Sequence, residues 1–232
     1  MISTSDNSVI FCERVICIFQ QAGSLAQFVT TFARFLDSIA IKMSPIDEEI
    51  RDCLLTLKSG GTLLYPTDTI WGIGCDATDN LAVEKIFRLK GRMESKSLII
   101  LLDTAEKLSD YVSVIPEIAW DLIKNVDTPL TIIYPDAKNL AKKVIADDGS
   151  IAIRVVKNEF CARLIREFGK PIVSTSANIS GQKPPMTYKN ISDQIIQGVD
   201  HVVDESLFQL QQVKASRIIK LNLNGEFLII RH

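Results

Sequence analysis

The feature that most constrains this chain is the alternation of amphipathic helices with short apolar strands that begins at Ser44. The segments with helical spacing are 45–57, 80–90, 103–112, 116–125, 138–145, 158–168 and 192–197. The runs typical of strands are 62–65, 97–102, 130–134, 150–156, 171–175, 201–204, 216–221 and 226–231. Helices interspersed with buried strands predict an α/β fold. A turn at Asn224-Gly225 would join the last two strands as a hairpin, so we expect a mixed sheet.

Local signals place the ends of several helices. The segment Ser44–Asp47 combines a capping hydroxyl, a proline at the first helical position and an acid at the positive end of the helix dipole. Asn80 is expected to cap the helix that runs to Lys90. Asp103 with Glu106 has the pattern of a capping pair that opens the next helix.

Residues 1–43 do not share this pattern. Their two apolar patches, at 9–19 and 26–41, are broken by polar residues. The start lacks the positive charge typical of a secretory signal, and acidic residues are too frequent for an organellar transit peptide. We therefore expect residues 1–43 to be an N-terminal extension before a domain of residues 44–232, with Met43 as the effective start. A packed accessory helix in the extension is the alternative.

Charge and cysteine content argue against several classes of protein. The net charge is −2, so no overall basic field marks a nucleic-acid-binding protein. Five cysteines without a CxxC pair, with only His201 and His232 as histidines, make a zinc site or a disulfide framework unexpected. No apolar run approaches the roughly 18 residues that a membrane span needs. We therefore expect a cytoplasmic protein with reduced thiols and no protein-bound metal cluster.

Three polar clusters follow or precede apolar strands, and ligands bind at strand ends in α/β sheets. The first, residues 65–69, is followed by Trp71–Gly74, whose glycines would let a ligand approach the main chain. The same residues also suit an ordinary turn. The second cluster, Lys90-Gly91-Arg92 with Lys96, offers cations that could bind phosphates. Basic residues at the C-terminal end of a helix also interact favourably with the helix dipole, so they need not bind a ligand.

The third cluster, residues 174–181, places five hydroxyl or amide side chains within seven residues. Such a loop can surround a phosphate or carboxylate with hydroxyls and main-chain amides. The chain has no Walker A loop, GxGxxG fingerprint or GxSxG elbow. Cys75 has no histidine partner that the sequence marks, so a buried core thiol is the simpler interpretation. The clusters favour a nucleotide cradle of a less familiar kind.

In their order and spacing the three clusters resemble the YrdC-like domain of threonylcarbamoyl-AMP synthases. The matching stretches are 65–77, 90–92, 96–99, 129–131, 151–154, 176–181 and 198–204. The resemblance covers roughly residues 45–231. It implies a twisted open sheet with a concave, positively lined cavity.

The resemblance also implies a reaction. L-Threonine is carboxylated by bicarbonate, and the carbamate displaces pyrophosphate from ATP to give threonylcarbamoyl-AMP. The family passes this product to a separate tRNA threonylcarbamoyl transferase complex, which modifies the adenosine beside the anticodon. Mg²⁺ is expected with ATP, held mainly by the phosphates and water. No side chain need act as a nucleophile, because positioning and electrostatics can carry the catalysis.

Residue by residue, the resemblance implies which positions bind each substrate. Those for L-threonine are Thr69, Arg154 and Ser174, with Thr67 nearby. Those for ATP are Arg92, Lys96, Ser150, Ser176, Ser216 and Arg231, with Lys90, Thr131, Asn178 and Ser180 close by.

Departures from the family pattern leave alternatives open. Thr175 stands where the family usually has proline, and Arg217 stands where it tends to have threonine. A YrdC-like module that binds RNA or nucleotide without synthesis is the main alternative, and weak RNA binding stays open beside synthesis. A carbamoyltransferase component of the kind used in hydrogenase maturation is less suited, since its chain is much longer.

Overall fold

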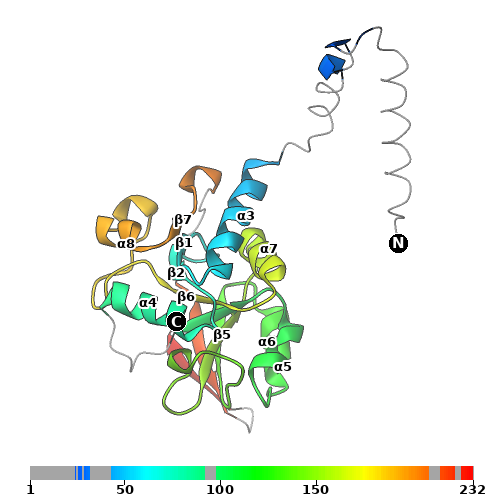
Figure 1. The fold of residues 1–232 in the computed structure, drawn as a ribbon. Helices are drawn as coiled ribbons and strands as arrows, with labels where there is room; N and C mark the ends of the chain where they lie inside the picture. The colour runs from blue at the N-terminus through cyan, green and yellow to red at the C-terminus, as the bar shows by residue number, and fades with distance from the viewer. Residues whose placement is uncertain are drawn as a thin grey trace. The chain divides into compact units, whose positions relative to one another are not determined.

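The computed structural model describes residues 43–91, 98–208, 215–222 and 226–231, together with residues 24, 26–27 and 29–31. The chain divides into two compact units, Met1–Ser44 and Pro45–His232. In the first unit the described residues 26–27 and 29–31 are helical, and the Thr30 hydroxyl donates to the Ala26 carbonyl at 2.9 Å. The second unit carries all the strands described below (Figure 1).

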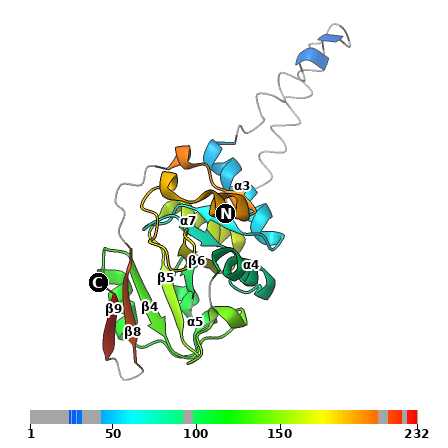
Figure 2. The same cartoon turned by 90° about the vertical axis from the view of Figure 1, so that its left-hand side faces the viewer.

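The unit Pro45–His232 is built on a nine-stranded mixed sheet with the order β7-β1-β2-β6-β3-β5-β4-β8-β9. The strands are β1 (Leu63–Tyr65), β2 (Gly72–Gly74), β3 (Ile99–Leu102), β4 (Leu130–Tyr134), β5 (Ile151–Val155), β6 (Ile172–Ser176), β7 (His201–Val202), β8 (Arg217–Leu221) and β9 (Phe227–Arg231). The pairs β1–β7, β3–β5 and β4–β8 are parallel, and the other neighbours are antiparallel. Figure 2 shows β4, β8 and β9 side by side at one end of the sheet. The predicted α/β fold with an open mixed sheet is confirmed.

Helices and single turns connect these strands. The helices are α3 (Pro45–Lys58), α4 (Asn80–Lys90), α5 (Leu108–Tyr111), α6 (Ile118–Asn125), α7 (Glu159–Phe168) and α8 (Asp193–Gly198). The 3₁₀ turns are η1 (Ala105–Lys107), η2 (Lys142–Val144), η3 (Tyr188–Asn190) and η4 (Glu205–Leu207). Helices α3 and α7 pack on each other, and α4 packs on α8 and η2 (Figure 1).

Helix α7 illustrates how the sequence sets an element. The Asn158 side chain accepts a hydrogen bond from the Cys161 backbone amide at 3.0 Å, which caps the first turn. Gly169 ends the helix at a φ of 77°, a left-handed conformation that glycine adopts without strain. Between the two caps, apolar residues recur at helical spacing and form one buried face: Phe160, Cys161, Ala162, Leu164 and Ile165.

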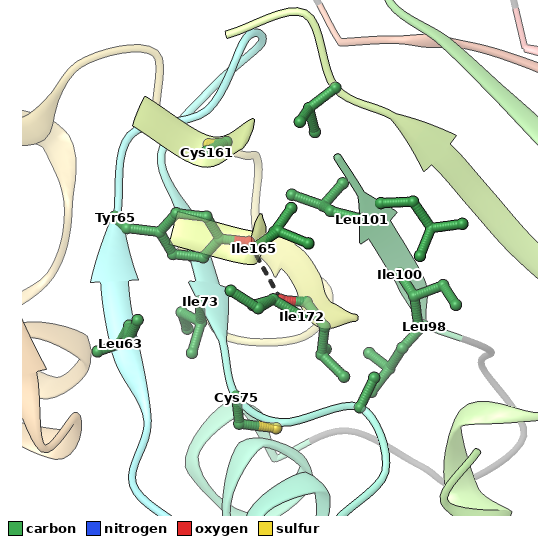
Figure 3. Packing of buried hydrophobic residues seen from close by; sticks show 14 of the residues in the cluster. Leu63, Tyr65, Ile73, Cys75, Leu98, Ile100, Leu101, Cys161, Ile165 and Ile172 are labelled. Atoms are coloured by element: carbon green, nitrogen blue, oxygen red, sulfur yellow. Dashed lines mark hydrogen bonds between the residues drawn. The ribbon is translucent and has the colours of Figure 1, made fainter. Parts of the chain in front are cut away.

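Tyr65 is one of the largest fully buried side chains of the core and lies beside β1 and β2 (Figure 3). Its hydroxyl donates to the Val173 carbonyl at 3.1 Å, so the buried oxygen is satisfied, and burial raises the pKa of Tyr65. The ring occupies space that a side chain on Gly74 would need, because a Cβ there would lie 2.6 Å from Tyr65 Cε1. Each large apolar side chain buried in this way contributes about 1.5–3 kcal/mol.

Two predicted caps are wrong. Asp79, one residue before the predicted Asn80, caps α4 by accepting from the backbone amides of Leu81 and Ala82. Asp103 is not the cap of the next helical turn, because its carboxylate pairs with Lys107 at 2.8 Å and that turn begins after Thr104. In both places a short polar side chain stands beside another one, and the sequence alone does not distinguish which of them faces the helix end.

Some predicted elements differ in extent. The predicted helix over 138–145 is reduced to η2, and 103–112 is split between η1 and α5. Strand β2 was not predicted, because a three-residue segment with two glycines has no apolar pattern. The predicted turn at Asn224-Gly225 lies outside the described residues.

The described cysteines Cys53, Cys75 and Cys161 are buried free thiols. None of the helices within the described residues is long and apolar enough to cross a membrane.

Candidate functional site

A pocket of about 350 Å³ is lined by residues of β2, β3, β4, β5, β6, β8 and β9 and by the loop after β1. Its polar side chains come from segments far apart in the sequence: Thr67, Thr69, Arg154, Ser174, Thr175, Ser176, Ser216 and Arg231. Its apolar side chains are Ile70, Trp71, Leu98, Ile99, Ile133, Ala152, Pro184, Ala215, Ile218 and Ile230. The pocket therefore combines an apolar wall with hydroxyl groups and two guanidinium groups, a lining suited to a polar or anionic ligand.

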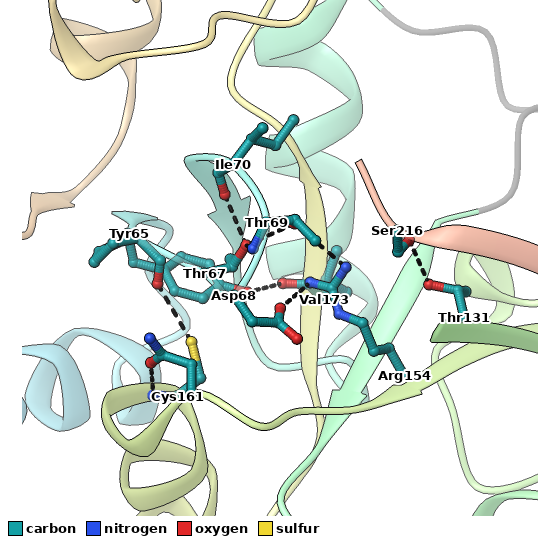
Figure 4. A network of polar contacts seen from close by, with 12 residues as sticks. Tyr65, Thr67, Asp68, Thr69, Ile70, Thr131, Arg154, Cys161, Val173 and Ser216 are labelled. Carbon is teal, nitrogen blue, oxygen red and sulfur yellow. Dashed lines mark hydrogen bonds and ion pairs between the residues drawn. The ribbon is translucent and has the colours of Figure 1, made fainter. Parts of the chain in front are cut away.

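The loop after β1 brings the first polar cluster into this pocket (Figure 4). The Thr67 hydroxyl donates to the Ile70 carbonyl at 2.7 Å and accepts from the Thr69 amide at 3.1 Å. The two threonine hydroxyls lie 2.9 Å apart. Residues 65–69 therefore form both a turn and part of the site. The hydrogen bonds of Thr67 hold a tight turn, and this turn places Thr69 in the lining of the pocket.

The three residues predicted for L-threonine converge. Arg154 Nη1 lies 3.4 Å from Thr69 Oγ1, although 85 residues separate them in the chain. Ser174 lies on β6 and also lines the pocket, because β3 pairs with both β6 and β5 and so places Ser174 and Arg154 on neighbouring parts of one sheet.

Arg154 is almost completely buried and is paired with Asp68, an acid that the sequence analysis did not single out. Its Nη2 lies 3.1 Å from Asp68 Oδ1, and the two side chains are only 4% and 9% exposed. Asp68 lies within the Tyr65–Thr69 motif. No sequence pattern indicates that it would pair with Arg154, which lies in a distant segment.

Two of the residues predicted for ATP meet where β8 and β9 reach the pocket. Arg231 Nε donates to the Ser216 carbonyl at 2.9 Å, and Arg231 Nη2 donates to the Ser216 hydroxyl at 3.2 Å. Ser216 and Thr131 share a hydrogen bond of 2.8 Å, and Thr131 is buried beneath the lining. Partial burial lowers the pKa of Arg231, and the nearby Arg154 cation lowers it further. Two cations that repel each other across one pocket are a favourable place for an anion.

Hydrogen bonds to Lys90 stabilise the loop Ser176–Ser180. The ammonium of this lysine is buried and donates to the carbonyls of Ser176 and Asn178, the second at 2.6 Å. The Ser180 amide donates to the Lys90 carbonyl at 2.8 Å. Ser176 lines the pocket, whereas Lys90, Asn178 and Ser180 are not among its lining residues.

Ser150 is not among the residues that line the pocket. It precedes β5, four residues before Arg154, and its hydroxyl donates to Asp148 at 2.5 Å. The hydrogen bond from Lys220 to Asp148, followed by those from Ser150, lowers the pKa of Asp148 to about 2. The Ser150 proton is thus committed to a carboxylate in this structure.

Arg92 and Lys96, the other two residues predicted for ATP, lie outside the described residues, because the structure describes nothing between Gly91 and Leu98. Their proximity to the pocket therefore stays a prediction.

Two other features could be taken for sites. A concavity of about 600 Å³ lies beside the start of α4, but two of its charged residues, Asp76 and Lys170, are already paired at 2.7 Å, and a third, Asp79, caps α4. Glu49, Cys53 and His201 converge within 4.8 Å of one another, a group that the sequence did not predict. His201 Nε2 lies 2.6 Å from Glu49 Oε1, which also accepts from the Cys53 thiol. These contacts satisfy one another, so we interpret the group as a link between α3 and β7.

Comparison with known proteins finds one matching family and similar sequences. The family described as telomere recombination (Sua5_yciO_yrdC) matches residues 55–232. A threonylcarbamoyl-AMP synthase of Pseudoalteromonas translucida is 35% identical over 161 residues, which are 68% of this chain and 86% of that protein.

Solved structures show the same fold. The Sua5 protein of P. abyssi matches with a TM-score of 0.73 and 26% identity over 83% of this chain and 58% of that one. Its complex with L-threonine matches with a TM-score of 0.70 and 28% identity over 78% of this chain and 52% of that one. This chain thus spans little more than half of the P. abyssi protein. The E. coli protein YciO matches 78% of this chain and 87% of its own with a TM-score of 0.67, and at 24% identity it bears on the fold alone.

Proposed function

This chain belongs to the Sua5/YciO/YrdC family, and from that premise we propose that it is a threonylcarbamoyl-AMP synthase. It joins ATP, L-threonine and bicarbonate, releases pyrophosphate, and makes the adenylate used for threonylcarbamoyladenosine modification of tRNA. The observation that carries this proposal is one pocket in which two arginines and a set of hydroxyl groups face the same space.

The L-threonine site that we propose is centred on Arg154. A guanidinium can take a carboxylate as a bidentate pair, and its five N–H groups exceed the two contacts that Nη1 and Nη2 make with Thr69 and Asp68. The hydroxyls of Thr69 and Ser174, both in the lining, would bind the polar groups of the amino acid, with Thr67 holding the turn. The P. abyssi protein solved with L-threonine shares this fold, which supports the assignment.

We assign the rest of the pocket to ATP, as a concave and positively lined cavity. Ser176, Ser216 and Arg231 are its proposed nucleotide contacts, since each lines the pocket. Arg92 and Lys96 are expected to add phosphate contacts from the segment after α4. Lys90, Thr131, Asn178 and Ser180 would then support these residues from behind, as their hydrogen bonds suggest. Ser150 would contact ATP only if its hydroxyl gave up the hydrogen bond to Asp148.

The reaction needs no protein nucleophile. The threonine amine attacks the carbon of bicarbonate to form a carbamate and water. A carbamate oxygen then attacks the α-phosphorus, and the bond to the pyrophosphate oxygen breaks. The described lining residues include no cysteine, histidine or lysine, so positioning and the guanidinium charges are what this part of the chain contributes.

Mg²⁺ is expected to enter with ATP. The described pocket-lining residues offer hydroxyl oxygens but no carboxylate, so they fit an ion that is held mainly by the triphosphate and water. The ion would supply neutralisation of the phosphate charge.

We further propose that residues 44–232 are the catalytic domain and that 1–43 are an extension outside it. The product would pass to a tRNA threonylcarbamoyl transferase complex in the cytoplasm, and weak RNA binding remains a prediction.

The decisive experiment is detection of threonylcarbamoyl-AMP by mass spectrometry after incubation with ATP, L-threonine, bicarbonate and Mg²⁺. We expect threonine to support pyrophosphate release, serine to support it less, and valine to fail, because a site that hydrogen-bonds a hydroxyl rejects an analogue without one. A module that only binds nucleotide or RNA would release no pyrophosphate. Equal rates with valine and threonine would contradict the proposed pocket.

A further inference from the structure

The carboxylate of Asp68 is the least explained polar group near the pocket. It follows β1 by three residues, is 9% exposed, and has Arg154 Nη2 at 3.1 Å from Oδ1 (Figure 4). Within the described part of the chain, neither of its oxygens receives a hydrogen bond of good geometry, and Arg154 Nε donates none. A buried group that keeps unused hydrogen-bonding capacity needs a reason, since most such groups in native proteins are satisfied.

Asp68 and Arg154 lie at different depths from the pocket, and this difference indicates a role for the buried carboxylate. Arg154 lines the pocket, whereas Asp68 is not among the lining residues. Asp68 therefore lies behind the arginine, where it can contact the guanidinium but is not placed to meet the ligand.

A buried, ion-paired aspartate elsewhere shows the contrast. Asp103 pairs with Lys107 at 2.8 Å and its side chain is only 2% exposed. Its lysine partner is 33% exposed, and neither residue lines the pocket. That pair joins two neighbouring turns of one segment, whereas Asp68 and Arg154 join a loop to a distant strand that faces the pocket.

We propose that Asp68 is a positioning residue, which holds the Arg154 guanidinium in the orientation that binds the carboxylate of L-threonine. This inference rests on the proposed synthase function. The carboxylate fixes one edge of the planar guanidinium, so the remaining N–H groups point to the pocket before the substrate arrives. Because less rotational freedom is then lost on binding, the site is preorganised for a carboxylate.

The charge of Asp68 gives the test a definite sign. An anion beside Arg154 weakens the attraction between that cation and a second carboxylate. Removal of the charge would by itself tighten threonine binding, so weaker binding in the variant would have the sign expected for loss of the guanidinium orientation and not the sign expected for loss of the charge.

The experiment compares Asp68→Asn, which keeps the size and one acceptor oxygen, with Asp103→Asn as the matched control. We expect Asp68→Asn to raise the KM for threonine about tenfold while kcat and the KM for ATP change less than threefold. Asp103→Asn should leave all three within twofold. An unchanged or lower threonine KM in Asp68→Asn would overturn the inference.

A double-mutant cycle with Arg154→Met separates positioning from general damage, read as threonine affinity by calorimetry. If Asp68 acts through Arg154, its substitution should have little further effect once the arginine is gone. Additive losses would contradict the proposal. Should Asp68→Asn not fold, Asp68→Glu keeps the charge but displaces it, and we expect the same selective rise in threonine KM. A wild-type protein that makes no adenylate would instead refute the synthase function itself.

Discussion

Lys90 shows how burial changes the meaning of a residue. Its position before Gly91-Arg92 suggests either a phosphate contact or a charge that answers the helix dipole. In the structure its ammonium is buried and donates to two carbonyls of the loop that carries Ser176. A cation used in this way fixes the shape of a ligand-binding loop without itself lining the pocket.

The first prediction follows from these two hydrogen bonds. Lys90→Met keeps a long apolar stem but removes the donors, and hydrogen bonds to charged groups are each worth about 1.5–3 kcal/mol. We expect the free energy of unfolding to fall by about 2–4 kcal/mol in urea denaturation and the KM for ATP to rise. Lys85→Met is the matched control on the same helix, because Lys85 is half exposed and donates to the Gly60 carbonyl at 2.9 Å. Equal stability of the two variants would show that the loop is held by other contacts.

At the scale of elements, β2 connects β1 with β6 in the sheet, and its glycines allow close packing there. The strand Gly72–Gly74 pairs with β1 on one side and β6 on the other. Gly72 lines the pocket, as the sequence analysis predicted for both glycines. Gly74 does not line it, and its missing side chain makes room for the Tyr65 ring and the β6 backbone.

The second prediction concerns that close approach. In Gly74→Ala the new Cβ would lie 2.5 Å from the Val173 carbonyl oxygen, and a backbone atom cannot move aside cheaply. We expect the free energy of unfolding to fall by about 2–3 kcal/mol, the upper part of the range for overpacked cores.

Gly169→Ala is the comparison for this variant, because a Cβ there meets nothing within 4 Å and only the φ of 77° is strained. That variant should lose about 1 kcal/mol, the lower end of the cost of a left-handed conformation for a residue with a Cβ. A Gly74→Ala loss no greater than the Gly169→Ala loss would show that β2 and β6 can separate freely.

The elements that the sequence predicts well are those with local signals. Helix α7 has its cap, its apolar face and its terminal glycine all between Asn158 and Gly169. Strand β2 has no such signal, and the cap of α4 was misplaced by one residue. The Asp68–Arg154 pair and the burial of Lys90 depend on contacts across about 86 residues, which periodicity and spacing do not encode. Only the family resemblance predicted that Thr69, Arg154 and Ser174 would meet.

At the scale of the molecule, the pocket is a product of the sheet order. Strand β6 lies between β2 and β3, and β5 follows β3, so the first and third polar clusters and Arg154 are neighbours in space. The β8–β9 hairpin adds Ser216 and Arg231 from the end of the chain, through the parallel pairing of β8 with β4. Every strand that lines the pocket belongs to the unit Pro45–His232, and none of the described pocket residues precedes Thr67.

The last prediction is that a protein starting at Met43 retains synthesis. The boundary between the two compact units falls at Ser44 and Pro45, and the family match begins at residue 55. A start at Met43 keeps all of α3, whose Ile50, Cys53 and Leu57 are buried in the core. We expect kcat/KM for threonine within twofold of the full chain and a similar melting temperature. A start at Gly60, which removes α3, is the contrasting variant, and loss of three buried side chains should leave it unfolded or insoluble. Insoluble or inactive protein from the Met43 start would show that residues 1–42 stabilise the catalytic domain.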